Sequence, residues 1–311
     1  MFHRTLSPDD PRWASCDPDY TLRRDLFVRA LAFFGAHYNV VSLQDVLDAR
    51  RGGRRLPPRA LLLTFDDGWA DNADHALPEL QRVGMPAVMF VVADAVGRRQ
   101  PFWQERLIAA WRLGRIRVAD VSAAMGIDNA LPAEADTEHE LAALRALIAR
   151  IEALPPANRE SLLATFDASM DDGLRHMVDT DELAGLRAGG VDLGLHGKRH
   201  VRMTEAEDLD SELAGAREAL RRVLGDADAS RMTTMSFPHG VYDMAIAEQA
   251  LHAGYELLFT SEPVLNPTAG APGWLLGRTG FETDTVLDSR GRFRADWLAW
   301  YLFRREARRL A

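Results

Sequence analysis

The stretch Leu61–Asn72, "LLLTFDDGWADN", places two adjacent aspartates and a glycine directly after an apolar run. The run from Ala60 to Phe65 has the length and composition of a buried strand. Asp66 and Asp67 repel each other and lose hydration beside an apolar core. Each therefore needs a hydrogen-bond donor, a basic side chain or a cation nearby.

On both sides of this stretch, short apolar runs alternate with helical patterns, which is typical of βα units and a parallel sheet. We expect strands at residues 2–6, 40–41, 60–65, 87–92, 191–195, 232–237 and 255–260. Helices are expected at 23–34, from Ser42, at 70–82, at 182–188, from a capping box of Thr204 and Glu207 to Leu224, and at 244–252. In a parallel α/β architecture the carboxyl ends of the strands share one face, where active sites are built.

Between about residues 101 and 179 the sequence becomes rich in Ala, Leu and Arg. An approximate helical stripe runs through Leu141, Leu144, Ile148, Ile151 and Leu154, and no strand pattern is evident. We therefore expect one catalytic domain over residues 1–311 with a helical insertion at about 101–180. The insertion would either shape or cover a site, or only add core.

Charge and cysteine content exclude several kinds of site. The net charge of -9 argues against nucleic acid as a partner, because phosphate binding requires clustered Lys and Arg. Cys16 is the only cysteine, so neither an internal disulfide framework nor a cysteine zinc site can form. Any metal must be bound by histidines and carboxylates.

The N-terminal text lacks the pattern of a signal peptide, and no window approaches the roughly 18 apolar residues of a membrane span. The cytoplasm is therefore the expected location. A C-terminal amphipathic helix is expected at about 295–310, where Trp297 and Trp300 precede several arginines. This composition suits peripheral membrane contact. Packing on the core is the favoured alternative.

The predicted strand at 191–195 ends in "HGKRH", which places His196 and His200 at i and i+4. That spacing can bring both imidazoles to one side of a turn. Two neutral imidazoles and one carboxylate form a three-ligand zinc site with an open position for water. Of the two aspartates, one would then ligate the metal and the other could act as a base.

These motifs resemble the NodB-homology polysaccharide deacetylases, carbohydrate esterase family 4. "TFDDG" at Thr64–Gly68 is similar to the first motif of the family, and "HGKRH" to the second. The segments "FHRTL", "YNVVSLQDVL" and "MPAVMFVV" are similar to the surrounding strands, so the resemblance covers Phe2 to Arg278 apart from the insertion. It implies a distorted (β/α) barrel and hydrolytic removal of an N-acyl group, in the first place acetyl.

The resemblance also implies roles for particular residues. Asp67, His196 and His200 would ligate a divalent metal, in the first place Zn²⁺, and Asp66 would be the general base. Such an ion would polarise the acyl oxygen and activate water, from which Asp66 would take a proton.

Two family motifs are altered. The third motif, R-P-P-Y-G in the family, is "SFPHG" here, with Ser236 in place of the arginine and His239 in place of the tyrosine. The backbone N–H at the tyrosine position is the oxyanion donor of the family, and His239 can keep that role. The late Leu-x-His motif, which supplies the general acid, is not recognisable, and Arg278 stands in the corresponding text.

The proton donor is therefore a hypothesis, with His239 or His3 as candidates. Arg278 is expected to steady Asp66 or to bind substrate. Trp69 is expected to line the substrate cleft, and Asp71 to line it or to cap the following helix.

The leading hypothesis is a metal-dependent deacetylase acting on an amino sugar or glycoconjugate. One alternative is hydrolysis of another C–N bond, such as that of a cyclic amide. A second alternative is a carbohydrate-binding relative without catalysis, against which Asp66 argues, because a metal-binding remnant needs no base.

Overall fold

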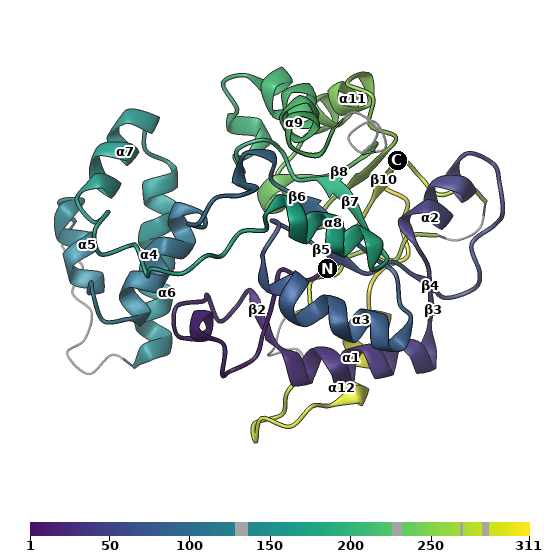
Figure 1. Ribbon diagram of the computed structural model, residues 1–311, viewed down its shortest axis with the longest axis horizontal. Helices are drawn as coiled ribbons and strands as arrows, with labels where there is room; N and C mark the ends of the chain where they lie inside the picture. The colour runs from purple at the N-terminus through teal and green to yellow at the C-terminus, as the bar shows by residue number, and fades with distance from the viewer. Residues whose placement is uncertain (128–135, 226–231, 268–269, 282–285) are drawn as a thin grey trace. The chain divides into compact units, whose positions relative to one another are not determined.

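The computed structural model describes residues 1–127, 136–225, 232–267, 270–281 and 286–311. The chain divides into two compact units (Figure 1). The first comprises residues 1–7, 19–98 and 177–311, and the second comprises residues 8–18 and 99–176. Residues 128–135 of the predicted insertion lie outside the described residues.

The first unit is built on a six-stranded sheet in the order β10-β9-β8-β7-β6-β5, with every neighbouring pair parallel. Its strands are β5 (Thr64–Phe65), β6 (Ala87–Val91), β7 (Val191–Leu195), β8 (Thr234–Ser236), β9 (Leu257–Phe259) and β10 (Leu275–Leu276). All five residues of β6 are buried, as expected for a central strand covered on both faces. Because the strands are parallel, the residues that follow β5, β7, β8 and β10 meet at one edge.

Two short parallel pairs lie outside this sheet. β1 (Arg4–Leu6) pairs with β2 (Thr21–Arg23), and β3 (Asn39–Val40) pairs with β4 (Ala60–Leu61). The predicted strand at 60–65 is therefore two strands, because β4 and β5 pair with different partners.

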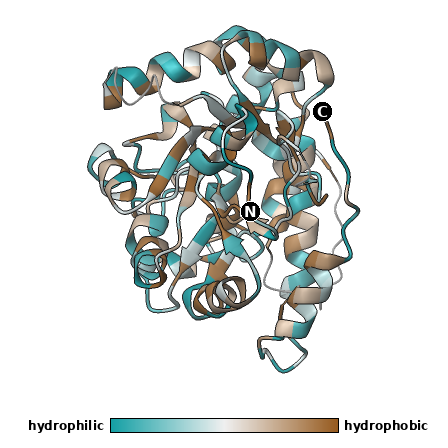
Figure 2. Cartoon of the chain, turned by 90° about the vertical axis from the view of Figure 1, so that its right-hand side faces the viewer, coloured by the Kyte–Doolittle hydropathy of each residue, from teal (hydrophilic) through white to brown (hydrophobic). Residues whose placement is uncertain are grey.

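Among its described residues, the α-helices of the first unit are α1 (Arg24–His37), α2 (Leu43–Arg50), α3 (Leu77–Val83), α8 (Thr180–Ala188), α9 (Leu209–Leu224), α11 (Met244–His252) and α12 (Ala295–Phe303). Hydrophobic and hydrophilic residues alternate along several of them, as expected for helices with one face on the core (Figure 2). In α9, for example, Leu213, Ala216 and Leu220 are all buried. α9 and α11 lie side by side, joined by a 2.8 Å hydrogen bond from Gln249 to Asp210 (Figure 1).

Several predicted helix boundaries are wrong. The capping box at Thr204 does not form, because Thr204 lies in a 3-10 turn, η4 (Met203–Glu205), and Asp208 caps α9 by accepting from Ser211 N. The helix expected at 70–82 begins as a π-helical turn, η2 (Asn72–Ala76), before α3.

The C-terminal helix ends at Phe303 rather than near residue 310, because the following backbone pairs with Leu265. Leu298 of α12 is fully buried, whereas Trp297, Trp300 and Phe303 are exposed. Membrane contact by this helix stays a prediction. None of the helices in the described ranges has the length and apolarity that crossing a bilayer requires.

The second unit contains α4 (Trp103–Arg112), α5 (Val118–Ala124), α6 (Thr137–Glu152) and α7 (Pro156–Ala164), and no strand among its described residues. Its own core includes Leu107, Leu144, Ile148, Ile151 and Met170. The domain boundaries, and the idea that this unit shapes or covers a site, stay predictions.

The centre of the sheet leaves no room for a side chain at Gly194 of β7. A Cβ there would lie 2.6 Å from Phe90 Cδ1 and 2.8 Å from Thr234 Oγ1. We expect Gly194→Ala to lower the free energy of unfolding by about 1–3 kcal/mol through overpacking, as measured by urea denaturation.

Gly185 in α8 provides the matched control, because an added Cβ there meets no atom within 4 Å. Gly185→Ala should leave the protein as stable or stabilise it by up to about 1 kcal/mol. A Gly194→Ala variant as stable as wild type would contradict this packing.

Candidate active site

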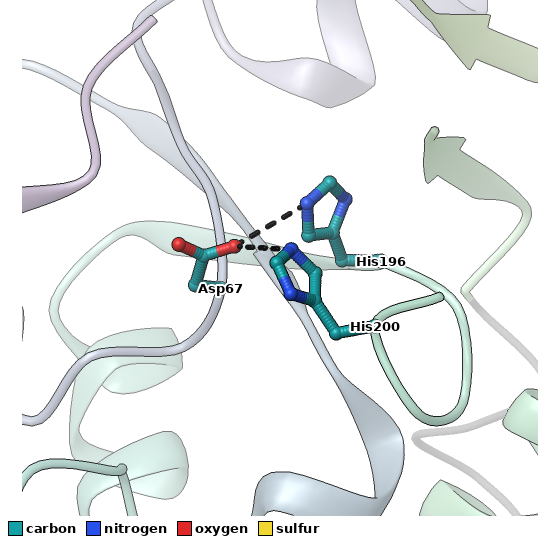
Figure 3. Close-up of side chains that lie close together, drawn as sticks. All are labelled: Asp67, His196 and His200. Carbon is teal, nitrogen blue, oxygen red and sulfur yellow. Dashed lines mark ion pairs between the residues drawn. The ribbon is translucent and has the colours of Figure 1, made fainter. Parts of the chain in front are cut away.

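Three side chains from two strand ends converge at the carboxyl edge of the sheet (Figure 3). Asp67 follows β5, and His196 and His200 belong to the loop that follows β7. His196 Nε2 lies 3.4 Å from Asp67 Oδ1, and His200 Nε2 lies 3.2 Å from the same oxygen. One potential ligand atom from each residue lies within 4.8 Å of the other two.

This donor set fits a divalent metal ion. Asp67 Oδ1 is buried and accepts no well-formed hydrogen bond within the described part of the chain, although both ring nitrogens lie near it. A buried acceptor without a donor costs about 1–3 kcal/mol. Two imidazole nitrogens and one carboxylate oxygen are the donors of a three-ligand zinc site.

His196 is held in the orientation that metal binding requires. Its Nδ1 lies 2.9 Å from Ser236 O, so this nitrogen carries the proton and donates it to the carbonyl. In the neutral ring the lone pair is then on Nε2, the nitrogen that faces Asp67. Burial lowers the pKa of His196, but Asp66 and Asp67 outweigh burial and raise it above the ordinary value. The two aspartates thus favour a positive charge at this position, and a bound metal ion would supply one.

Asp67 is fixed from its other side by Trp69. The residue adopts a left-handed backbone with φ 78°, and Trp69 Nε1 donates to its Oδ2 at 3.0 Å. The Arg4 guanidinium lies 4.3 Å over the Trp69 ring and donates to Asp71 Oδ2 at 2.7 Å. These contacts leave Oδ1 of Asp67 directed at the two histidines.

Trp69 and Asp71 therefore differ from expectation. The Trp69 side chain is only 1% exposed, so its ring is packed against Arg4 instead of lining a cleft. Asp71 is fully buried and pairs with Arg4, and its side chain makes no helix-capping hydrogen bond.

Asp66 is compensated by Arg278, which follows β10. The guanidinium makes two parallel 2.7 Å hydrogen bonds to the two carboxylate oxygens, and Ser236 Oγ donates to Oδ2 at 3.3 Å. Burial favours the neutral acid, but Arg278 and His196 outweigh it and lower the pKa of Asp66 to about 2. Asp66 is thus ionised at neutral pH. Of the two uses expected for Arg278, the structure shows the one that steadies Asp66.

His3 lies beside the aspartates because the chain before β1 runs along β5. Phe2 N donates to Thr64 O at 2.8 Å, and Asp66 N donates to Phe2 O at 3.0 Å. Burial lowers the pKa of His3, while Asp67 and Asp66 act in the opposite direction. The exposed Tyr20 ring contacts the His3 ring edge-on at 4.9 Å.

His239 lies next to the second histidine of the loop. Its ring centroid is 4.5 Å from that of His200, and its side chain is exposed. The backbone at His239 is left-handed, with φ 56°. Both candidate proton donors thus lie near the three-residue cluster, His3 beside the aspartates and His239 beside His200.

Two buried charged residues, Arg4 and Glu212, were not predicted from the sequence. Arg4 lies two residues from both Phe2 and Leu6, which are buried. Glu212 lies beside Leu213 and one turn before Ala216 on the buried stripe of α9. A charged residue at an apolar position was the available signal, because a buried charge needs a specific partner.

Comparisons with known proteins show similarity in sequence and in fold. The family model described as polysaccharide deacetylase matches residues 53–143. The poly-beta-1,6-N-acetyl-D-glucosamine N-deacetylase of Escherichia coli K12 is 43% identical over 59 residues, which are 19% of this chain and 9% of the length of that enzyme. The chain thus matches a small part of that relative.

Two solved structures share the fold across nearly the whole chain. The Streptococcus pyogenes deacetylase PplD, in complex with acetate, has a TM-score of 0.58 at 14% identity, covering 97% of this chain and 96% of that one. IcaB from Ammonifex degensii has a TM-score of 0.58 at 17% identity, covering 97% and 94%. The predicted α/β distorted barrel is therefore confirmed, and within it residues 53–143 are similar to the polysaccharide deacetylase family.

Proposed function

We propose that this protein is a metal-dependent hydrolase that removes an N-acyl group, in the first place acetyl, from an amino sugar of a polysaccharide or glycoconjugate. The observation that supports this proposal is that the two aspartates face different partners. Asp67 faces His196 and His200, whereas Asp66 is held ionised by Arg278. The name of the Escherichia coli relative supports a polymer of N-acetylglucosamine as the substrate class.

A bound dication such as Zn²⁺ would polarise the amide carbonyl and acidify a water molecule at this site. Asp66 would accept the proton of that water, since its carboxylate is ionised and oriented by two hydrogen bonds from Arg278. The backbone N–H of His239 would donate to the developing oxyanion. A backbone donor does not depend on the side chain, so the change from tyrosine to histidine is compatible with this role.

For protonation of the departing nitrogen we favour His3 over His239. His3 is partly buried beside Asp66 and Asp67. Burial outweighs the two carboxylates and lowers the pKa of His3, which makes its protonated form a stronger acid. His239 is exposed and packs against His200. Cytoplasmic location and membrane association remain predictions from composition.

The first test replaces the proposed base. Asp66→Asn keeps the size of the side chain but removes the proton acceptor, so it should lower kcat for acetate release by at least about 100-fold. Acetate is measured on chitooligosaccharides and on β-1,6-linked N-acetylglucosamine oligomers with zinc supplied. Asp25→Asn, at an exposed position of α1, is the matched control and should retain full activity.

The outcome against the proposal is a wild-type protein that binds metal but releases no acetate from any N-acetyl sugar in an Asp66-dependent way. Ring opening of a cyclic amide under the same conditions would instead support the alternative C–N hydrolase.

A second test identifies the proton donor. His3→Gln should lower kcat on N-acetyl sugars by about 100-fold, whereas His239→Asn, which tolerates the left-handed backbone, should retain most activity. On 4-nitrophenyl acetate, whose leaving group needs no proton, His3→Gln should lose little. Equal activity of His3→Gln and wild type on the amide would eliminate His3 as the donor.

A further inference from the structure

The loop that carries both histidines is short and locally strained. It spans residues 196–200, directly after β7, and His200 has a left-handed backbone with φ 62°. A side chain in this conformation costs about 1–2 kcal/mol, so surrounding contacts must hold the loop in place. The two ring Nε2 atoms converge on Asp67 only while the loop keeps this shape.

Glu212 holds the N–H side of the loop. This α9 residue is fully buried, and its Oε2 accepts from Lys198 N at 2.9 Å and from Arg199 N at 3.0 Å. Its Oε1 accepts from Arg199 Nε at 2.6 Å. One carboxylate therefore binds two consecutive backbone N–H groups that lie between the two histidines.

The carbonyl side of the loop is held by a separate element, the 3-10 turn η3 (Ala93–Ala95). Ala93 N donates to Gly197 O at 3.2 Å, and Asp94 N donates to Lys198 O at 2.9 Å. Gly197 is left-handed, with φ 70°, and a Cβ there would lie 3.1 Å from both Met203 and Pro238. The loop is thus fixed between η3 and α9.

We propose that Glu212 is a positioning residue for the metal site. It binds the backbone between His196 and His200 and so keeps both imidazoles directed at Asp67. This inference rests on the proposed function in one respect, namely that these three residues bind a metal ion. Removing the carboxylate leaves the backbone N–H groups of Lys198 and Arg199 without this acceptor, and the loop is then free to change shape as they find other partners.

The test measures Zn²⁺ affinity of the metal-free protein by competition with a chromophoric chelator. Glu212→Leu, which has similar volume and no acceptor, should weaken zinc binding by about 10–100-fold, the usual cost of losing an outer-shell partner. Glu212→Gln keeps an oxygen for the two N–H groups and should retain most of the affinity. This rescue would not follow if Glu212 served only as a charge partner for Arg199.

Glu218→Leu is the matched control, because Glu218 lies on the same helix and pairs with Arg221 at the surface. It should leave zinc affinity unchanged. If Glu212→Leu does not fold, Glu212→Asp decides, since it keeps the charge but draws the carboxylate back from the loop. Its zinc affinity should also fall.

A folded Glu212→Leu or Glu212→Asp protein with wild-type zinc affinity would overturn the inference and leave the proposed function intact. A wild-type protein without zinc affinity would instead contradict the proposed function itself.

Discussion

Two adjacent buried carboxylates, Asp66 and Asp67, are the constraint on which the site depends. Both follow one short strand, and both side chains are buried, so water cannot solvate either charge. The left-handed backbone at Asp67 breaks the extended path of the chain and lets the two side chains face different partners. Asp66 takes a buried arginine, whereas one oxygen of Asp67 is left facing two imidazoles. This separation allows one residue to bind an ion and its neighbour to remain a free base.

The partners come from distant parts of the chain and meet because the sheet is parallel. Arg278 follows β10, Ser236 ends β8, and the two histidines follow β7. Arg278 orients Asp66 through two hydrogen bonds, a task that the resemblance would assign to an arginine at the position of Ser236. A rigid guanidinium can donate to both oxygens from either position, because the contact depends on geometry rather than on order in the sequence. Ser236 then completes the contact by hydrogen bonding to both groups.

Much of this arrangement could be predicted from the sequence. The apolar runs predicted the strands. The motifs around Asp66 and His196 predicted that the proposed metal ligands and base lie at the carboxyl edge of the sheet. Contacts that depend on tertiary structure could not be predicted in this way. Trp69 looked like a cleft residue because aromatic side chains near a motif often contact sugars, but the buried Arg4 covers its ring. Thr204 and Glu207 have the pattern of a capping box, yet Asp208 caps the helix. The role of Glu212 depends on a loop that lies before its own helix in the chain, and no local pattern reports that contact.

The central claim is that Asp67, His196 and His200 share one ion and that Asp66 stands apart from it. Anomalous diffraction at the zinc edge, from crystals grown with zinc, tests this most directly. The account predicts one strong peak at about 2.0–2.2 Å from one oxygen of Asp67 and one nitrogen of each histidine, with Asp66 still paired to Arg278. A peak ligated by Asp66, or no peak among these three residues in zinc-saturated crystals, would contradict it.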